Sequence, residues 1–442
     1  MDRQFGKSIK NTEIASLNFY AVGVRRTKNF IANSVLLTGI LYWKVDQSKT
    51  KNLFRIVFIL SSVFLLLSIN HMRYRYHSLA PGKPFSFGDF LAFWSYQEIA
   101  RTHSAAGLYD IAATYQRQLD LGMDPDPKMP FPYPPSFLLL IWPLGLLPYV
   151  MGYILWLPGT LSLFVFSIFK MCCRLSFALG CAVVAPACVY SIYYAQGGFL
   201  TGALLTTGIL LAKTRPIVSG ILIGILTFKP QLGLLIPVAL AAAGLWRTFT
   251  VACATVTALV IITAIAFGPE AWVAWIAGLP EYSEWFQAPS TGMVFRISVT
   301  DILRLSGFGS NTVISAQALV STAVASLTWV SFRRGFTRLS CAALLTGAIL
   351  ASPHALIYDA PMVVASMIIF VQARIETTAI FNINEILILL ASFVSPILLI
   401  LVNTAAVPAA IFFSFALLYL LILRSDLVVK YKEVADVTAP VL

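Results

Sequence analysis

The feature that most constrains this chain is a succession of apolar runs, repeated from residue 54 to residue 423. In a bilayer each backbone polar group must be hydrogen-bonded within its own span, so runs of this kind fold as helices. Hydrophobic residues make up 58% of the chain and charged residues only 11%, which excludes a water-soluble globular protein. The sequence therefore predicts one all-α, polytopic membrane domain of about 12 transmembrane helices.

Basic residues between the apolar runs set the predicted topology, because cytoplasmic loops are enriched in Lys and Arg. This rule places both termini in the cytoplasm of a multi-pass plasma (inner) membrane protein. The formal charge of +12 is scattered between apolar runs and forms no basic face, so no nucleic-acid partner is expected. The predicted spans are 54–70, 148–169, 177–193, 200–211, 217–228, 232–245, 251–267, 313–332, 340–351, 357–371, 386–402 and 409–423.

The predicted domain organisation has three parts. Residues 1–52 form a cytoplasmic or interfacial segment, residues 53–424 the transmembrane domain, and residues 425–442 a cytoplasmic tail. Two long segments face the outside, a first outer loop at 71–135 and a second outer loop at 268–311.

The first outer loop is expected to carry interfacial helices. Apolar residues follow helical spacing after Asp89, and the motif that ends at Asp110 opens a second, polar helix over 111–119. The apolar stretch 137–147 is broken by Pro143, and counting it as a crossing would place the following basic loops outside. It is therefore predicted to be a re-entrant or interfacial half-helix.

Several ionisable residues share the predicted outer side. Lys229 interrupts an apolar run there, and a buried cation needs a fixed or transient anion, such as a phosphate. The alternative is a lysine that snorkels to the interface. His354 and Asp359 lie at another outward end, where an interfacial histidine and a structural ion pair are the plainer interpretations. Asp89 follows a glycine where a helix would begin, so it is equally a helix N-cap.

Short motifs that contain these residues follow one another along the chain. They are Gly88-Asp89-Phe90, Gly107-Leu108-Tyr109-Asp110, Tyr133-Pro134-Pro135-Ser136-Phe137, Ala195-Gln196-Gly197, Phe228-Lys229-Pro230-Gln231, and Ser352-Pro353-His354 with Tyr358-Asp359. In this ordered set the chain resembles glycosyltransferase family 87 over roughly residues 54–371.

The resemblance implies a GT-C-like fold and a membrane glycosyltransferase. Such an enzyme would transfer a hexose, typically mannose, from a polyprenyl-phosphate-linked donor to an acceptor glycan or glycolipid on the outer face of the membrane, inverting the anomeric carbon. Asp89 falls on the family's general base. Lys229, His354 and Arg296 suit the donor phosphate, which gains negative charge as the glycosidic bond breaks. The expected substrate contacts are Gln196, Glu98, Tyr133, Tyr358 and Asp359.

The chain departs from the family pattern at Ala195-Gln196-Gly197-Gly198, where the pattern has Gly before Gln and Asn two residues after it. This leaves the role of Gln196 and the donor sugar open. No residue pattern requires a metal or a cofactor. Two other functions fit the composition, a transporter or flippase of a lipid-linked saccharide and a non-catalytic scaffold. A transporter is less favoured because the two halves of the chain show no matching interrupted segments.

Overall fold

A computed structural model describes residues 59, 61–68, 89–121, 123, 129–172, 175–287, 295–377, 381–401 and 406–438 of the chain. Over this part the protein is helical and contains no strand, as the sequence predicts. An isolated β-bridge joins Arg296 to Leu356. The predicted N-terminal segment 1–52 and about half of the first predicted span, 54–70, lie outside the described residues.

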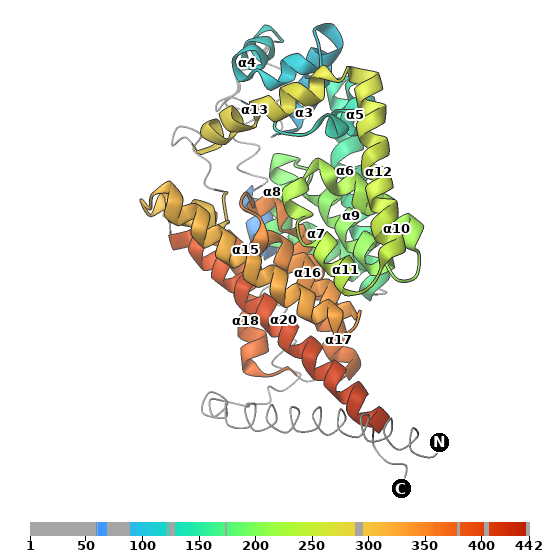
Figure 1. Cartoon of the computed structure of the whole chain (residues 1–442). Coiled ribbons are helices and arrows are strands. Elements are labelled where there is room, and N and C mark those ends of the chain that lie inside the picture. The colour runs from blue at the N-terminus through green and yellow to red at the C-terminus, as the bar shows by residue number, and fades with distance from the viewer. Residues whose placement is uncertain are drawn as a thin grey trace, which may run out of the picture.

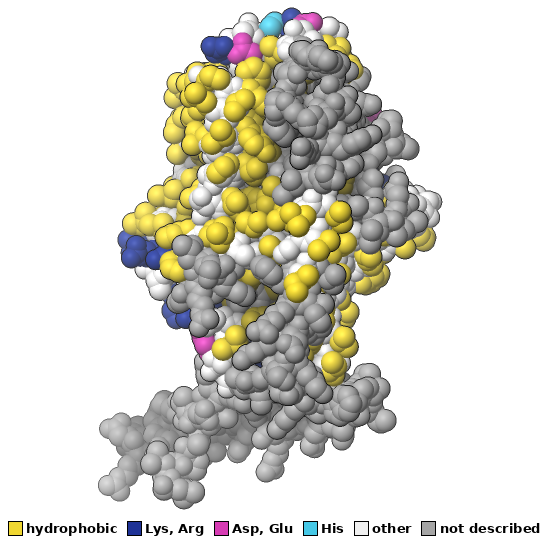
Figure 2. All heavy atoms as spheres, turned by 180° about the vertical axis from the view of Figure 1, so that it is seen from behind, with side chains coloured by type: hydrophobic (Ala, Val, Ile, Leu, Met, Phe, Trp, Pro, Cys, Tyr) yellow, Lys and Arg dark blue, Asp and Glu magenta, His cyan; other side chains and the backbone are white. Residues whose placement is uncertain are grey.

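Four helices are long and apolar enough to cross a membrane: α6 (Tyr149–Cys172), α12 (Trp246–Phe267), α15 (Ser310–Arg333) and α20 (Ala406–Thr438). Much of their apolar surface faces outward. In the most apolar 18-residue stretch of α12, only 11% of the residues are buried inside the protein. Hydrophobic side chains also cover much of the described surface seen in Figure 2. Apolar residues exposed on this scale are expected where the surrounding solvent is hydrocarbon, so these helices embed the protein in a membrane.

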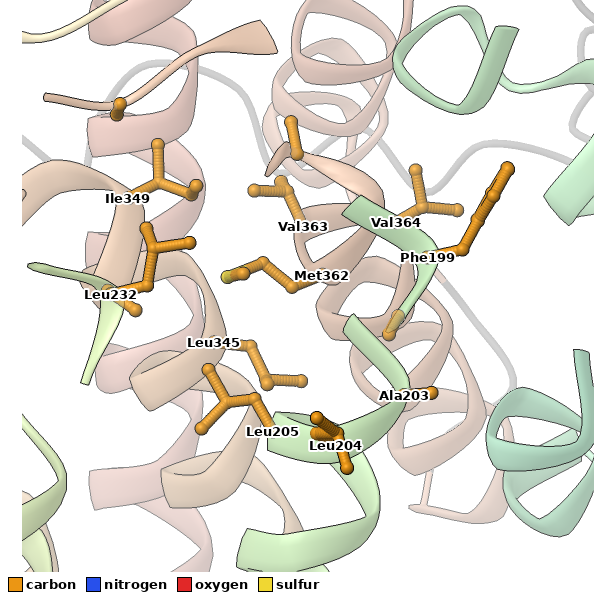
Figure 3. Close-up of a cluster of buried hydrophobic side chains, with 14 of the residues drawn as sticks. Phe199, Ala203, Leu204, Leu205, Leu232, Leu345, Ile349, Met362, Val363 and Val364 are labelled. Atoms are coloured by element: carbon orange, nitrogen blue, oxygen red, sulfur yellow. The ribbon is translucent and has the colours of Figure 1, made fainter. Parts of the chain in front are cut away.

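Shorter apolar helices form the core of the bundle. α9 (Gly198–Leu211), α16 (Arg338–Ala351) and the first part of α17 (Pro361–Thr377) are buried on nearly all sides, as expected for helices that are hydrophobic all round. Their side chains meet in one cluster, to which α9 contributes Phe199 and α16 contributes Leu345 (Figure 3). α15 and α20 pack against the outer side of α16 (Figure 1).

One predicted span is divided into two helices. Residues 177–193 fall in α7 (Leu175–Val184) and α8 (Pro186–Tyr194), which begins at a proline. Proline has no N–H to donate and its ring displaces the preceding turn, so the helix ends and restarts there.

The predicted spans 217–228 and 232–245 are also shorter than expected. α10 (Pro216–Ile225) passes into a 3-10 turn, and α11 (Ile236–Ala242) has seven residues, a length of about 10 Å against a hydrocarbon core of about 30 Å. Two 3-10 turns, η3 (Leu226–Phe228) and η4 (Pro230–Leu232), separate them. Twelve full-length crossings are therefore not confirmed.

Helices that do not follow the bundle direction form a cap at one end of the molecule (Figure 1). They include α3 (Phe90–Thr102), α4 (Ile111–Asp120) and α13 (Glu270–Gln287), and α5 (Pro135–Gly145) lies beneath them. The helices predicted after Asp89, at 111–119 and at 137–147 are confirmed as helices. α13 was not predicted, because residues 268–311 were interpreted only as a loop.

The remaining elements are short or peripheral. They are η2 (Ala106–Tyr109), α14 (Val299–Leu305), η6 (Ile357–Asp359), α18 (Ile383–Val394), η7 (Ser395–Ile397) and α19 (Leu398–Leu401).

Candidate active site

Asp89 occupies the N-cap position of α3, but its side chain does not cap the helix. Its backbone N–H donates to the carbonyl of Tyr194 at the end of α8, 2.8 Å away. Its carboxylate Oδ2 instead accepts a hydrogen bond from Nε2 of Gln196. The N-cap interpretation is thus correct for the backbone position and wrong for the side chain, which accepts its hydrogen bond from Gln196.

The turn after α8 places Gln196 beside Asp89. Ala195 ends α8 in the left-handed conformation, with φ of +48°, and its carbonyl accepts from Nε1 of Trp156 at 2.9 Å. This is the position at which the family pattern has Gly, the residue that adopts positive φ without steric cost. Ala195 thus adopts a backbone conformation that glycine favours.

The second departure, Gly198, lies where the chain passes very close to η6. A Cβ built on Gly198 would lie 1.7 Å from the carbonyl oxygen of Tyr358, a clash with backbone that no rotamer change relieves. The hydroxyl of Ser191 donates to the same carbonyl at 2.7 Å. The segment that carries Tyr358 and Asp359 is therefore packed directly against the start of α9.

Burial raises the pKa of Asp89 to about 6, although the hydrogen bond from Gln196 and the charge of Lys229 both act to lower it. A carboxylate with this pKa is ionised at neutral pH and retains enough basicity to accept a proton from a hydroxyl. Perturbed carboxylates of this type are concentrated at functional sites.

Lys229 stands between η3 and η4 and is buried, as is its partner Asp359. The two side chains form an ion pair, with Nζ 2.5 Å from Oδ1, and the ammonium also lies 5.4 Å from the ring centroid of Tyr358. Of the anions that the sequence left open for Lys229, the structure supplies a fixed carboxylate. The snorkelling alternative is wrong, because the side chain of Lys229 is only 4% exposed.

Tyrosines fill the space around the carboxylates. Burial is the main cause that raises the pKa of Tyr133 and of Tyr282, and the charges of Asp89 and Asp359 raise both further. The positive charge of Arg296 acts on Tyr282 in the opposite direction. Tyr282 on α13 therefore lies within reach of both the carboxylates and a cationic group.

The cationic group is Arg296, which lies where two extended segments, 295–297 and 355–357, pair through backbone hydrogen bonds. The N–H of Ile297 donates to the carbonyl of Ala355 at 3.0 Å, and Ile357 donates to Phe295 at 2.9 Å. Arg296 lies between them, buried, and its guanidinium donates to the carbonyl of Phe286 and stacks over that ring, 4.4 Å from its centroid.

His354 contacts the same Phe286 ring, with the two ring centroids 5.2 Å apart. Burial lowers the pKa of His354 to about 4, and the positive charges of Arg304 and Arg296 lower it further. The imidazole is therefore neutral at pH 7 and can accept or donate one hydrogen bond at each nitrogen according to its tautomer.

Most of the predicted site residues are thus brought to one region, and Glu98 is not. It lies nine residues after Asp89 on the axis of α3, about 13 Å away along the helix, and it pairs with Arg101 at 2.6 Å on a partly exposed surface. Arg304 was missed, because residues 268–311 were predicted only as an outer loop. The spacing Ser298 to Asp301 to Arg304, which marks a capped helix with one charged face, was the available signal.

The described part of the protein is an all-helical membrane bundle. The partly buried carboxylate of Asp89 lies at the start of cap helix α3, with the Lys229–Asp359 ion pair beside it and Arg296 nearby. A family model of glycosyltransferase family 87 matches residues 131–357, which is just over half of the 442-residue chain. The chain belongs to this family and is a membrane glycosyltransferase. No curated protein and no solved structure matches it significantly.

Proposed function

We propose that this protein transfers a hexose, with mannose as the first candidate, from a polyprenyl-phosphate-linked donor to an acceptor glycan or glycolipid on the outer face of the membrane. The observation that carries the proposal is the carboxylate of Asp89. It is partly buried, does not cap its helix, accepts a hydrogen bond from Gln196 and is raised in pKa to about 6. These are the properties of a general base that accepts a proton from an attacking hydroxyl.

In the proposed reaction Asp89 removes the acceptor proton while the hydroxyl oxygen attacks the anomeric carbon. A single displacement of this kind inverts the anomeric configuration. The bond to the phosphate oxygen breaks with its electron pair, so negative charge develops on the polyprenyl phosphate. Fixed cationic and hydrogen-bonding groups stabilise that charge without reorganisation during the reaction.

The proposed phosphate contacts are His354, Arg296 and Lys229. His354 and Arg296 share the Phe286 ring, and the charge of Arg296 reaches Tyr282, which also experiences the charge of Asp89. Lys229 is paired with Asp359, and its ammonium has three donors, so two remain for a substrate oxygen. This arrangement supports a donor bound with its phosphate toward the cations and its anomeric carbon toward Asp89.

Gln196, Tyr133, Tyr358 and Asp359 line the same region and are proposed to contact the sugars. Glu98 lies apart, and its proposed contact is restricted to an extended acceptor that reaches the outer surface of the cap. The orientation with both termini in the cytoplasm and the site outside is part of the proposal.

The test is transfer of radiolabelled mannose from polyprenyl-phosphate mannose by purified protein in detergent, with a membrane-lipid and glycan extract as acceptor. Asp89→Asn is expected to lower turnover by at least about 100-fold, the usual contribution of a general base. Asp120→Asn, an exposed carboxylate on α4, is the matched control and should keep wild-type turnover. Unchanged turnover in Asp89→Asn contradicts the base assignment. Absence of product together with faster lipid flipping in liposomes would favour the transporter.

A further inference from the structure

A hollow in the cap lies apart from the residues proposed to bind the donor. It is bordered by η2 and the start of α4, by α13, and by the proline-rich segment 130–132. Its aromatic rings are those of Tyr109, Phe131, Trp275 and Tyr282. Leu279 also lines it and is 41% exposed, so the hollow is shallow and open on one side. No charged side chain is among the described residues that line it, which suits a neutral ligand better than an ionic one.

Hydrogen bonds to the proline-rich segment hold the walls of the hollow in place. Nε1 of Trp275 donates to the carbonyl of Pro132 at 3.2 Å, and the hydroxyl of Tyr109 donates to the carbonyl of Tyr133 at 3.0 Å. Proline has no N–H to donate, so side chains of the cap take the place of a backbone ladder here. Rings that are already ordered lose little conformational freedom when a ligand packs on them.

The side chains of the hollow match the two kinds of surface on a sugar ring. A pyranose ring has C–H groups on its faces and hydroxyls around its rim, and its faces pack on aromatic rings. Trp275 and Tyr282 are only partly buried. The hydroxyl of Tyr282 makes no hydrogen bond to another described residue and can bond to a sugar hydroxyl. Apolar walls with few polar groups are typical of small-molecule sites.

Aromatic contacts connect the hollow to Asp89. Phe131 packs on Tyr133, with ring centroids 5.8 Å apart, and Tyr133 packs on Phe93 at 5.9 Å. The backbone N–H of Phe93 donates to the carbonyl of Asp89 at 3.2 Å. From the other wall, Tyr282 is close enough to Asp89 for that charge to add to the effect of burial in raising its pKa. A ligand with a hydroxyl at Asp89 therefore extends toward the hollow.

An isoprenoid chain is the other ligand that apolar walls suit, and the position of the hollow argues against it. The hollow lies in the cap, beside α4, at one end of the molecule (Figure 1). α4 exposes Gln116, Arg117 and Asp120. Charged side chains of this kind face water or lipid head groups and not hydrocarbon. The hollow therefore lies in the part of the cap that an acceptor glycan reaches and a lipid tail does not.

We infer that this hollow binds a pyranose ring of the acceptor, beyond the ring that carries the attacking hydroxyl. Trp275 stacks on that ring and Tyr282 bonds to one of its hydroxyls. The inference rests on the proposed function, in which Asp89 accepts the proton of the attacking hydroxyl, and it assigns a separate carbohydrate subsite to the cap.

The experiment measures binding of methyl α-D-mannopyranoside, methyl α-D-glucopyranoside and methyl β-D-galactopyranoside to the purified full-length protein by saturation-transfer difference NMR. The detergent carries no sugar head group, and protein-free micelles give the blank. At least one glycoside is expected to show transfer to its ring C–H protons. Trp275→Ala should weaken that signal about fivefold, whereas Trp275→Phe, which keeps an aromatic face, should retain most of it. Trp246→Ala, at a tryptophan that is 58% exposed at the start of α12, is the matched control.

Blocking the hollow tests the site without removing any of its rings. In a variant without native cysteines, Leu279→Cys is labelled with a maleimide that carries a short polyethylene glycol. The glycoside signal should match wild type before labelling and disappear after it. Asp120→Cys, at an exposed position on α4, should keep the signal after the same labelling.

Four results overturn the inference. They are no signal from any of the three glycosides, a signal that survives labelling at residue 279, equal loss in Trp275→Phe and Trp275→Ala, and displacement of the glycoside by farnesol. The third would show that Trp275 only supports Pro132, and the fourth that the hollow holds an isoprenoid chain.

Transfer activity separates this inference from the proposed function. If transfer occurs, labelling at residue 279 should raise the KM for the acceptor extract several-fold and leave the donor KM unchanged. An unchanged acceptor KM overturns the inference while the proposed function stands. If the glycoside signal depends on the hollow as expected and no transfer is found with any donor, the carbohydrate site stands and the proposed function fails.

Discussion

The pKa of Asp89 determines how the proposed reaction depends on pH. Because burial raises this pKa to about 6, the carboxylate is protonated and inactive as a base below that pH. We expect kcat/KM to fall about tenfold per pH unit below pH 6 and to level off above it. The measurement is the transfer rate from pH 4.5 to 8, with Asp120→Asn giving the same profile. A rate that stays constant between pH 5 and 7 contradicts this prediction.

The same shift has a consequence for stability. The folded-state pKa of Asp89 lies above its ordinary value of 3.8, so protonation favours the folded state, and this advantage is lost as the pH rises through about 6. Asn has no charge to desolvate and keeps an oxygen for the amide of Gln196. We therefore expect Asp89→Asn to raise the thermal midpoint in detergent at pH 7.5 and to have little effect at pH 4.5. A lower midpoint at both pH values would show that the charge stabilises the fold.

Ala195 illustrates how far a sequence predicts backbone conformation. The departure from Gly was visible, but whether the turn kept a positive φ was not, because Ala adopts that conformation at a cost of about 1–2 kcal/mol. The structure gives φ of +48°. We expect Ala195→Gly to leave the thermal midpoint equal or higher, whereas Ala203→Gly, in buried helix α9, lowers it. A lower midpoint for both variants, measured by differential scanning fluorimetry, would contradict the strain at Ala195.

At the scale of elements, the close approach of α9 to η6 determines where Tyr358 and Asp359 lie. Gly198 has no room for a Cβ against the carbonyl of Tyr358, so Gly198→Ala must separate the two elements and move Tyr358 and Asp359. We expect a loss of about 2 kcal/mol or more of stability, in the range of overpacked cores, and a loss of transfer activity. Gly159→Ala on α6, where nothing lies within 4 Å, is the matched control and should be neutral or stabilising. Equal behaviour of the two variants would contradict the close contact.

The Lys229–Asp359 ion pair links the turn between η3 and η4 to η6. Its contribution to stability and the proposed contact of Lys229 with the donor can be tested separately. Lys229→Met alone leaves a buried carboxylate unpaired and should cost about 3–5 kcal/mol. The double variant Lys229→Met with Asp359→Leu should recover most of that stability, because no buried charge remains. If Lys229 also contacts the donor, the recovered double variant keeps a raised donor KM. A wild-type KM in that variant would assign Lys229 a purely structural role.

The sequence predicted helices well where side-chain spacing and proline positions decided them, and poorly where apolar length or local backbone did. The helices after Asp89, at 111–119 and at 137–147 follow from spacing and proline positions, and the structure confirms them. The 3-10 turns beside Lys229 and the helix α13 depend on tertiary packing, which an apolar run does not encode. For the same reason the sequence placed Lys229 and Asp359 on one side without showing that they pair.

At the scale of the whole molecule, the arrangement of charge predicts which side of the membrane carries the site. The cap that contains α13 lies at one end of the molecule, and the turn between α15 and α16 carries Arg333 and Arg334 (Figure 1). Because cytoplasmic loops are enriched in bases, that turn should face the cytoplasm and the cap the outside. In a variant without native cysteines, Glu281→Cys on α13 should react with a membrane-impermeant maleimide in intact cells, and Arg334→Cys should react only after permeabilisation. Both positions are exposed, so a difference in labelling reports sidedness and not burial. The reverse labelling would place Asp89 on the cytoplasmic side, where the reaction would need a donor and an acceptor from the cytoplasm.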